Sequence, residues 1–260
     1  MLCEGAFLPL VEKMTAILYN SSWILSFGGE EMAESFPIKV IARIKSDFPT
    51  KFGIPRQSGL VDSLKARIIF EPEYRDPQAF RGLELYTHIW LIWQFSEAVR
   101  DNWSPTVRPP RLGGNTRMGV FATRSPFRPN PLALSSVKLE KVEFDKELGP
   151  VLHISGADLM DNSPIYDIKP YLPYTDSHPE ASNGFALATK EAVLQVEFPD
   201  ELLSTVPEQS REALIDVLAQ DPRPGYKNES DRIYGFEFAG LEVKFSVNNG
   251  VLTVLDIESL

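Results

Sequence analysis

The chain has few of the residues that build disulfides or metal sites. Its 260 residues include one cysteine and three histidines. One cysteine, Cys3, can form no internal disulfide and cannot supply a cysteine-based zinc site. The histidines, His88, His153 and His178, lie far apart and lack the spacing of metal ligands. We therefore expect a cytoplasmic protein that needs no metal.

Several common functional patterns are also missing. No apolar run approaches the ~20 residues of a membrane helix, so no membrane partner is expected. The sequence contains no Gly-rich dinucleotide or Walker-type loop, no GxSxG elbow and no HExxH or CxxC motif. A doubly wound nucleotide-binding domain is thereby disfavoured. The net charge of −10 argues against indiscriminate binding to nucleic acid but leaves room for a local basic face.

The first 31 residues are patchily apolar, with Lys13 as their only base. A signal peptide has a basic start, a continuous apolar core and a small-residue cleavage site, and this segment does not fit that description. We interpret residues 1–31 as a disordered leader or as the product of a start codon assigned too early, with Met32 as the working start.

Apolar alternation predicts a mainly β protein. Short helices are expected after Pro77 and around Glu97, but no regular helical crossovers connect the strands. Such a pattern favours an antiparallel sheet or barrel over a parallel α/β sheet. The predicted strands are 38–46, 65–70, 84–95, 117–123, 134–144, 150–156 and 164–169.

The composition changes after about residue 185. Helical spacing is clearest at Ala213, Leu214, Val217 and Leu218, and three strand-like runs follow at 232–238, 241–247 and 251–257. We expect an antiparallel β-barrel core over 32–185 and a small α+β C-terminal domain over 190–260.

One segment is dense in arginine. Between residues 100 and 130 the only acidic residue is Asp101, and no lysine is present, whereas the arginines are Arg100, Arg108, Arg111, Arg117, Arg124 and Arg128. Arginine grips phosphate or carboxylate with two parallel hydrogen bonds. Trp103 and Phe127 lie among these residues, and exposed aromatic rings stack on bases. The pattern favours an anionic partner over a solvated surface.

Proline stiffens this segment at its end. In 119–131, GVFATRSPFRPNP, proline cannot join a sheet ladder and makes the residue before it extended. The loop should therefore hold Arg124 and Arg128 at fixed positions. Prolines flank Arg223 in the same way in DPRPGYK, and we expect Asp221, Arg223, Tyr226 and Lys227 to belong to an RNA-binding loop. A tight turn would explain the same prolines and glycine.

Acidic residues gather in 158–174, DLMDNSPIYDIKPYLPY. Asp158, Asp161 and Asp167 could accept hydrogen bonds from hydroxyls or amines, bind a cation or act as bases. As turn residues, Asp161 and Asn162 would need no further role. Chemistry alone leaves both readings open.

Taken together, these motifs resemble the TsaA-like family, and within it the TrmO-type tRNA methyltransferases. The resemblance covers roughly 36–258 and rests on KFGIPRQSGLV, RGLExxxHxW at 81–90, GVFATRSPFRPNP, DLMDNSPIYDIKPYLPY and AQDPRPGY. It implies a β-barrel, a homodimer, S-adenosylmethionine as cofactor and an anticodon loop of tRNA as partner. The implied reaction is methylation of N6 of threonylcarbamoyl-adenosine at position 37.

The resemblance also implies site residues. Matching motif to motif, the cofactor site comprises Arg56, Gln57, Ser58, Phe95, Ser96, Arg124, Leu134, Asp158, Leu159, Met160 and Asp161. Asp161 is the candidate general base, and Arg108, Arg111, Arg117 and Arg128 are candidate tRNA contacts beside the loop at 221–227. Two positions depart from the family pattern: Ser96 stands in place of histidine, and Asn162-Ser163 in place of Gly-Thr.

Two other functions compete with this one. In the first, the chain is a non-catalytic RNA-binding module whose aspartates only shape turns. In the second, it is a cofactor-dependent enzyme for a small molecule and the C-terminal part is structural. A cofactor cavity at Arg124 and Asp158 would count against the former, and a 221–226 loop beside that cavity would count against the latter.

Overall fold

The computed structural model describes residues 35–112, 115–186, 193–223 and 232–260. Contacts divide the chain into two units, 1–37 and 38–260, and only the second is described over most of its length. The expected leader, 1–31, lies outside the described residues. In the described part of the chain, no helix has the length and apolar character needed to cross a membrane.

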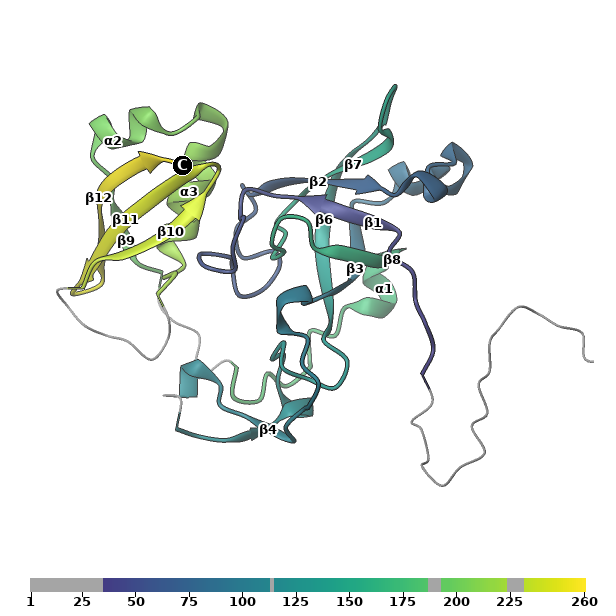
Figure 1. Cartoon of the computed structure of the whole chain (residues 1–260), viewed down its shortest axis with the longest axis horizontal. Helices are drawn as coiled ribbons and strands as arrows, with labels where there is room; N and C mark the ends of the chain where they lie inside the picture. The colour runs from purple at the N-terminus through teal and green to yellow at the C-terminus, as the bar shows by residue number, and fades with distance from the viewer. Residues whose placement is uncertain (1–34, 113–114, 187–192, 224–231) are drawn as a thin grey trace, which may run out of the picture. The chain divides into compact units, whose positions relative to one another are not determined.

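Strands dominate the second unit (Figure 1). They are β1 Ala42–Lys45, β2 Lys65–Phe70, β3 His88–Gln94, β4 Thr106–Val107, β5 Met118–Gly119, β6 Leu132–Asp145, β7 Gly149–Ser155, β8 Pro164–Pro170, β9 Gln195–Glu197, β10 Tyr234–Phe238, β11 Leu241–Asn248 and β12 Val251–Ser259. The α-helices are α1 Pro173–Asp176, α2 Asp200–Thr205 and α3 Glu208–Ala219. Short 3₁₀ helices are η1 Pro72–Tyr74, η2 Pro77–Phe80, η3 Leu83–Leu85, η4 Ser96–Ala98, η5 Pro110–Leu112 and η6 Val120–Ala122.

Six strands close into a barrel in the order β1-β2-β7-β6-β3-β8. Every neighbouring pair is antiparallel. Alternate residues of β2 face inward, as the sequence alternation predicted; Ala66, Ile68 and Phe70 are buried. Ile89, Leu91 and Trp93 of β3 are buried in the same way and join one core cluster with them. The predicted antiparallel barrel is thus confirmed.

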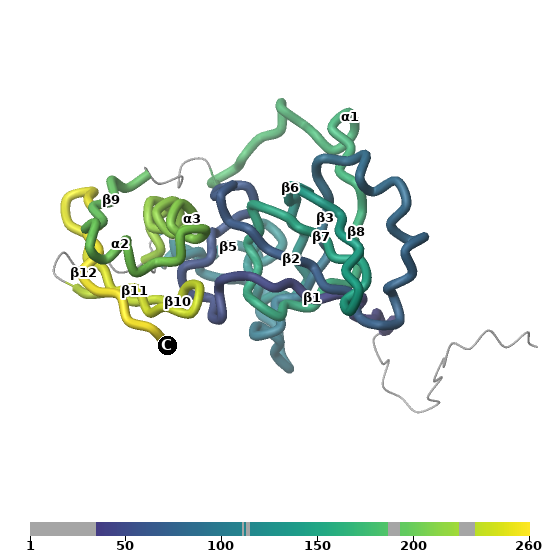
Figure 2. The backbone as a smooth tube through the Cα atoms, turned by 90° about the horizontal axis from the view of Figure 1, so that it is seen from above, coloured from purple at the N-terminus to yellow at the C-terminus, as the bar shows by residue number. Residues whose placement is uncertain are grey.

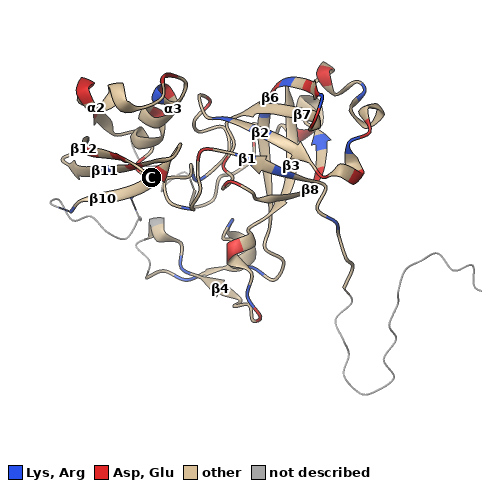
Figure 3. Ribbon diagram, turned by 45° about the horizontal axis from the view of Figure 1, so that its top comes forward, with Lys and Arg blue, Asp and Glu red and all other residues tan. Residues whose placement is uncertain are grey.

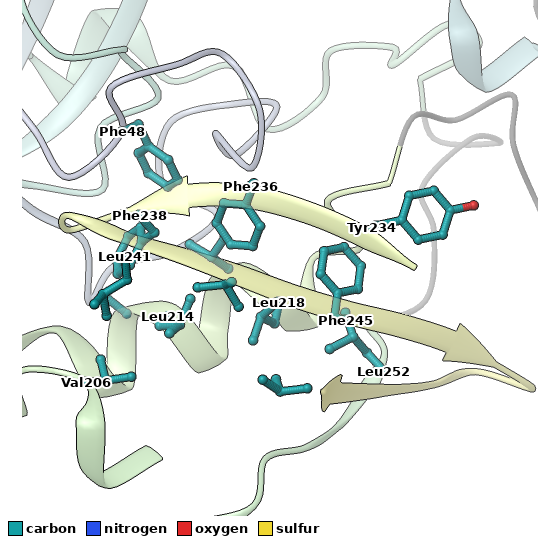
Figure 4. Packing of buried hydrophobic residues seen from close by; sticks show 14 of the residues in the cluster. Phe48, Val206, Leu214, Leu218, Tyr234, Phe236, Phe238, Leu241, Phe245 and Leu252 are labelled. Carbon is teal, nitrogen blue, oxygen red and sulfur yellow. The ribbon is translucent and has the colours of Figure 1, made fainter. Parts of the chain in front are cut away.

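A second sheet, ordered β10-β11-β12-β9, forms the C-terminal part. The strands of the barrel and those of this sheet form separate groups in two views (Figures 1 and 2). The core cluster of this C-terminal part includes the four residues of α3 whose spacing predicted a helix, Ala213, Leu214, Val217 and Leu218. Figure 4 shows Leu214 and Leu218 of α3 near the aromatic side chains of β10 and β11. The short strand β9 pairs parallel with β12 and was not predicted.

The barrel and the C-terminal sheet pack on each other through the loop between β1 and β2. Phe48 is only 2% exposed, and its ring meets that of Phe238 edge to face at 5.2 Å (Figure 4). Gly53 has φ +79°, and a Cβ built there would lie 2.3 Å from the Phe236 ring. The backbone N–H of Ala239 also donates to the carbonyl of Asp47 at 2.9 Å. This loop, which also carries 56–58, is thereby fixed against both parts.

Three predicted strands are longer than the observed ones. The expected strand 117–123 pairs with β4 only at β5, next to which the Val120 N–H donates to the carbonyl of Pro105. The Thr123 N–H then donates to the carbonyl of Val120 and closes the turn η6. The strand expected from residue 84 begins at His88, after η3. The strand expected over 38–46 is confined to β1. The helices expected after Pro77 and around Glu97 are single 3₁₀ turns, η2 and η4.

Candidate functional site

A cavity of about 720 Å³ opens where β3 ends and β6 begins. Its walls come from five segments: the loop 54–58, the end of β3, the loop 123–128, the start of β6 and the loop 158–163. Phe95 and Trp93 supply aromatic wall, and Leu134 lines the cavity although it is 56% exposed. An apolar pocket of this size with a few converging polar groups is the usual form of a small-molecule site.

A chain of hydrogen bonds leads from the barrel core to Asp158. The indole Nε1–H of Trp93 donates to Ser135 Oγ at 2.9 Å, and the Ser135 hydroxyl donates to Asp158 Oδ1 at 2.6 Å. Trp93 and Ser135 are 4% and 2% exposed. Burial raises the pKa of the Asp158 carboxyl, while the bond from Ser135 and the charge of Arg124 oppose that rise. The hydrogen bond from Ser135 therefore holds the carboxyl in place beside the cavity.

Polar side chains converge on the rim of the cavity. Arg124 Nη1 donates to Gln57 Oε1, and Gln57 Nε2 contacts the carbonyl of Arg56. The guanidinium of Arg56 donates to the carbonyl of Arg223 at 3.2 Å. This bond connects the cavity with the segment 221–223 of the C-terminal part. Three stretches that are remote in sequence thus meet at one edge.

The proline-rich loop is braced from within. Arg128 Nη1 donates to the carbonyl of Thr123 at 3.0 Å and to that of Ser125 at 3.4 Å. The backbone N–H of Phe127 donates to Ser125 Oγ at 3.2 Å. These bonds and the prolines fix the backbone around Arg124, which explains why the sequence uses a stiff loop here. The Arg128 side chain therefore serves the loop as well as the surface to which we had assigned it.

The remaining expected cofactor residues separate into two groups. Ser58, Ser96 and Met160 line the cavity, as do Arg56, Gln57, Phe95, Arg124, Leu134 and Asp158. Leu159 is 1% exposed and packs in the barrel core. The Asp161 carboxylate accepts from the Ser46 backbone N–H at 3.0 Å and from Lys45 Nζ at 3.4 Å, and this residue does not line the cavity. Asp161 therefore does not stand where a general base in the cavity would be needed.

One departure from the family pattern has a local reason. Asn162 has φ +64°, a left-handed conformation that glycine adopts freely and asparagine tolerates better than most residues. The neighbouring Ser163 is 2% exposed and lines the cavity. Asparagine can therefore replace glycine at this turn without changing its course.

A larger groove of about 1430 Å³ adjoins the cavity and shares Arg56, Gln57, Arg124 and Phe127 with it. Blue ribbon for Lys and Arg marks the loops near β4 (Figure 3). The described residues that line the groove include no Asp or Glu, whereas the arginines are Arg56, Arg100, Arg108, Arg117, Arg124, Arg128 and Arg223. The side chain of Arg111 lies outside the described residues. An arginine-lined concave surface in a protein of net charge −10 will concentrate an anionic partner there.

The expected RNA-binding loop at 221–227 is described only as far as Arg223; Tyr226 and Lys227 lie outside the described residues. Asp221 has φ +54° and is 9% exposed. Both of its carboxylate oxygens accept from the Arg223 guanidinium at 2.7 Å. Asp221 therefore fixes Arg223 at the groove and is not itself a phosphate contact.

Sequence reasoning missed Trp93 and Ser135. Both are buried at inward positions of their strands, and Ser135 is in phase with Val137 and Leu139 of β6. A serine among inward apolar residues was the available signal, since a buried hydroxyl needs a partner. It also missed the segment 182–186, which lines the groove.

Comparisons with known proteins agree with this geometry. The family model described as the tRNA-methyltransferase O N-terminal domain matches residues 43–177, and the TrmO C-terminal domain matches 191–260. The tRNA (adenine(37)-N6)-methyltransferase of Escherichia coli (strain K12) is 40% identical over 232 residues, covering 86% of this chain and 98% of that protein. A Pseudomonas aeruginosa protein, RcsF, whose name places it among S-adenosylmethionine-dependent methyltransferases, is 38% identical over 229 residues, covering 85% and 96%. The crystal structure of TrmO from Pseudomonas aeruginosa superposes with a TM-score of 0.70 at 32% identity and covers 87% of this chain and 100% of that one.

Proposed function

The chain belongs to the tRNA-methyltransferase O (TrmO) family, and we propose that it methylates N6 of adenine 37 in tRNA after that adenine has received a threonylcarbamoyl group. Its cofactor is S-adenosylmethionine. The observation that carries the proposal is the shared wall: a cofactor-sized cavity opens beside an arginine-lined groove, with Arg124 and Phe127 lining both.

The residues of the cavity suit this cofactor. Its volume of about 720 Å³ lies within the range of small-molecule pockets. Arg124 and Arg56 can bind a carboxylate, and the fixed Asp158 can accept hydrogen bonds from an ammonium group or a ribose diol. Phe95, Trp93 and Leu134 supply the apolar surface against which an adenine packs. When bound, S-adenosylmethionine supplies a methyl group on a sulfonium, which leaves readily.

The contribution of the chain is chiefly alignment. Methyl transfer requires the acceptor nitrogen in line with the breaking bond, and such positioning contributes as much as ~7–11 kcal/mol in favourable cases. The stiff loop from Thr123 to Arg128 meets that need because its internal hydrogen bonds fix Arg124 at the meeting point of cavity and groove. We do not assign Asp161 as the base, since its carboxylate is held by Lys45 and Ser46.

The threonylcarbamoyl group adds a carboxylate to the acceptor base. That anion would enter from the groove, whose lining includes seven arginines and, among the described positions, no acidic residue. An unmodified adenine offers no such anion. The preference for the modified tRNA therefore follows from the charge of the shared wall.

The shared wall of cavity and groove also favours this function over the two alternatives, an RNA-binding module and an enzyme for a small molecule. A purely RNA-binding module would have no need of an apolar cavity with a half-buried carboxylate. An enzyme for a small molecule would have no need of the wide arginine groove or of the bond from Arg56 to Arg223. We assign cofactor binding to 32–185 and a share of tRNA binding to 190–260, because Arg223 lines the groove. A cytoplasmic site of action goes with a tRNA substrate.

We also propose a homodimer as the active form. Phe127 of the proline-rich loop is 41% exposed and Leu134 of β6 is 56% exposed, and both line the cavity. Light scattering should report twice the mass of 29.2 kDa at micromolar concentration. A fully active monomer at that concentration would contradict the proposal.

The test of the reaction uses three tRNA substrates of one sequence. The first is an unmodified transcript, the second carries the threonylcarbamoyl group on adenine 37, and the third has guanine at position 37. With methyl-labelled S-adenosylmethionine, label should enter only the second, and mass spectrometry of its nucleosides should show one methylated threonylcarbamoyl-adenosine. Equal labelling of the first two would refute the preference for modified tRNA. Absence of label in all three would refute methylation itself.

A further inference from the structure

We propose that Trp103 and Phe121 form a stacking platform for an unpaired base of the tRNA loop next to the base that is methylated. The inference rests on the proposed function, because it takes the occupant of the groove to be tRNA. The two rings line the groove with their centroids 6.2 Å apart and their planes at 33°. They are 53% and 75% exposed.

The backbone turn η6 explains why Phe121 faces the groove. Val120 is 1% exposed and Phe121 is 75% exposed, so consecutive residues point to opposite sides. The Val120 N–H donates to the Pro105 carbonyl at 3.0 Å, and the Thr123 N–H closes the turn on Val120. Burial of Val120 therefore holds Phe121 outward, and a large apolar side chain that is held outward in this way has a surface for a partner.

Cations line the same groove as the platform. Arg108 and Arg117 line the same groove, and Arg117 Nη1 donates to Thr106 Oγ1 at 2.9 Å on the strand that follows Trp103. Neither arginine has a carboxylate partner among the described residues. Aromatic rings in a groove lined by cations are the arrangement by which proteins hold single-stranded nucleic acid. A purely apolar partner would leave these guanidinium groups to be desolvated without compensation.

Phe127, the other aromatic residue that we expected to stack on bases, differs from this pair. The Arg100 guanidinium lies over its ring at 3.9 Å from the centroid. That cation–π contact occupies one face and ties Phe127 to the arginine beside it. Phe121 therefore replaces Phe127 as the partner of Trp103.

The short distance of the platform from the cavity indicates which nucleotide of the tRNA it binds. Phe121 precedes Arg124 by three residues, a span of at most about 10 Å along the chain, and Arg124 lines both the cavity and the groove. A base on the platform is thus a neighbour of the base at the cavity. Unstacked loop bases are the ones that proteins hold on aromatic rings.

The experiment measures tRNA affinity, cofactor affinity and methylation for Trp103→Ala, Phe121→Ala and Phe121→Leu. We expect tRNA binding to weaken about 5- to 150-fold for each alanine variant, with cofactor affinity unchanged. Trp103→Phe and Phe121→Tyr should restore most of the binding, whereas Phe121→Leu, which keeps apolar area but loses the ring, should not. Phe144→Ala is the matched control, because Phe144 is 57% exposed and lines neither the cavity nor the groove.

Salt dependence separates stacking from phosphate contact. Loss of a stacking residue should lower the logarithm of the tRNA association constant by the same amount at every salt concentration. Loss of Arg117 should instead make the dependence of that logarithm on log salt less steep, by the equivalent of about one phosphate contact. Unchanged tRNA affinity in both alanine variants, with wild-type methylation intact, would overturn the platform and leave the proposed function standing. Dissociation of a dimer without a change in tRNA affinity would show a second copy of the chain as the occupant and would also overturn it. Absence of methylation by the wild-type protein would instead count against the proposed function.

Discussion

Replacing Ser135 by alanine tests whether the buried hydrogen-bond chain governs the cofactor cavity. The Ser135 hydroxyl accepts from the Trp93 indole and donates to Asp158. Alanine fits the strand but removes both bonds. The indole N–H then stays buried without its partner, which costs about 1–3 kcal/mol of stability, and the carboxylate loses a bond of the charged class, about 1.5–3 kcal/mol.

The two losses differ in their dependence on pH. Burial already raises the pKa of Asp158 above its value in the unfolded chain. The stability that the protonated Asp158 carboxyl contributes is therefore fully present below the unfolded pKa and is lost as the pH rises through the folded pKa. The hydrogen bond from Ser135 lowers that pKa, and its removal will raise it further. Ser135→Ala should therefore be most destabilising at neutral pH, where both losses act, and less so in acid, where the indole loss alone remains.

The assay combines denaturant unfolding with calorimetric titration of S-adenosylmethionine across pH. Cofactor affinity should fall as the solution is acidified, and in the variant that fall should begin at higher pH than in the wild type, because the carboxylate is protonated earlier. Ser135→Thr keeps a hydroxyl and should restore the wild-type profile. Ser210→Ala removes a buried serine of α3 remote from the cavity and serves as control. An unchanged pH profile of cofactor affinity in Ser135→Ala would refute the reasoning.

The remaining predictions concern three other residues. Arg124→Ala should weaken cofactor binding about 10- to 150-fold, the equivalent of one hydrogen bond to a charged group, with an unchanged circular dichroism spectrum because the side chain is exposed; wild-type affinity in calorimetry would contradict this. Arg117→Ala should weaken tRNA binding in gel shifts but leave cofactor affinity intact, since Arg117 lines the groove and not the cavity. Phe48→Ala should lower the free energy of unfolding by about 3–5 kcal/mol, because Phe48 is buried between the barrel and the C-terminal sheet; a loss below 1 kcal/mol in denaturant titration would show that this packing is unimportant.

The alternation of apolar residues in the sequence predicted strands that have a neighbouring strand on each side. The strand β2 was found at its observed bounds because three inward residues alternate with Lys65, Arg67 and the half-buried Ile69 between two neighbouring strands of the barrel. By contrast, β9 has only three residues, of which two are polar and exposed, and it exists through parallel pairing with β12, more than fifty residues away. Local sequence carries no sign of such a partner.

The candidate site shows the same division. Arg124 and the stiff loop could be identified from residue type and proline spacing. The difference between Asp158 and Asp161 could not, because it depends on the turn between them and on Lys45, which lies far away in the sequence. Ser135 and Trp93 looked like ordinary strand residues until the register of β3 and β6 placed them in contact.

The loop from Phe121 to Arg128 explains how two binding sites can share one wall. A wall that contacts both the cofactor and the RNA transmits any movement on one side to the other, so a flexible connector would blur the relative position of the two reactants. Prolines and the bonds of Arg128 to two carbonyls remove that freedom in the folded state. Since an in-line transfer loses its advantage with small misplacements, we infer that rigidity of this loop serves the proposed reaction as well as the fold.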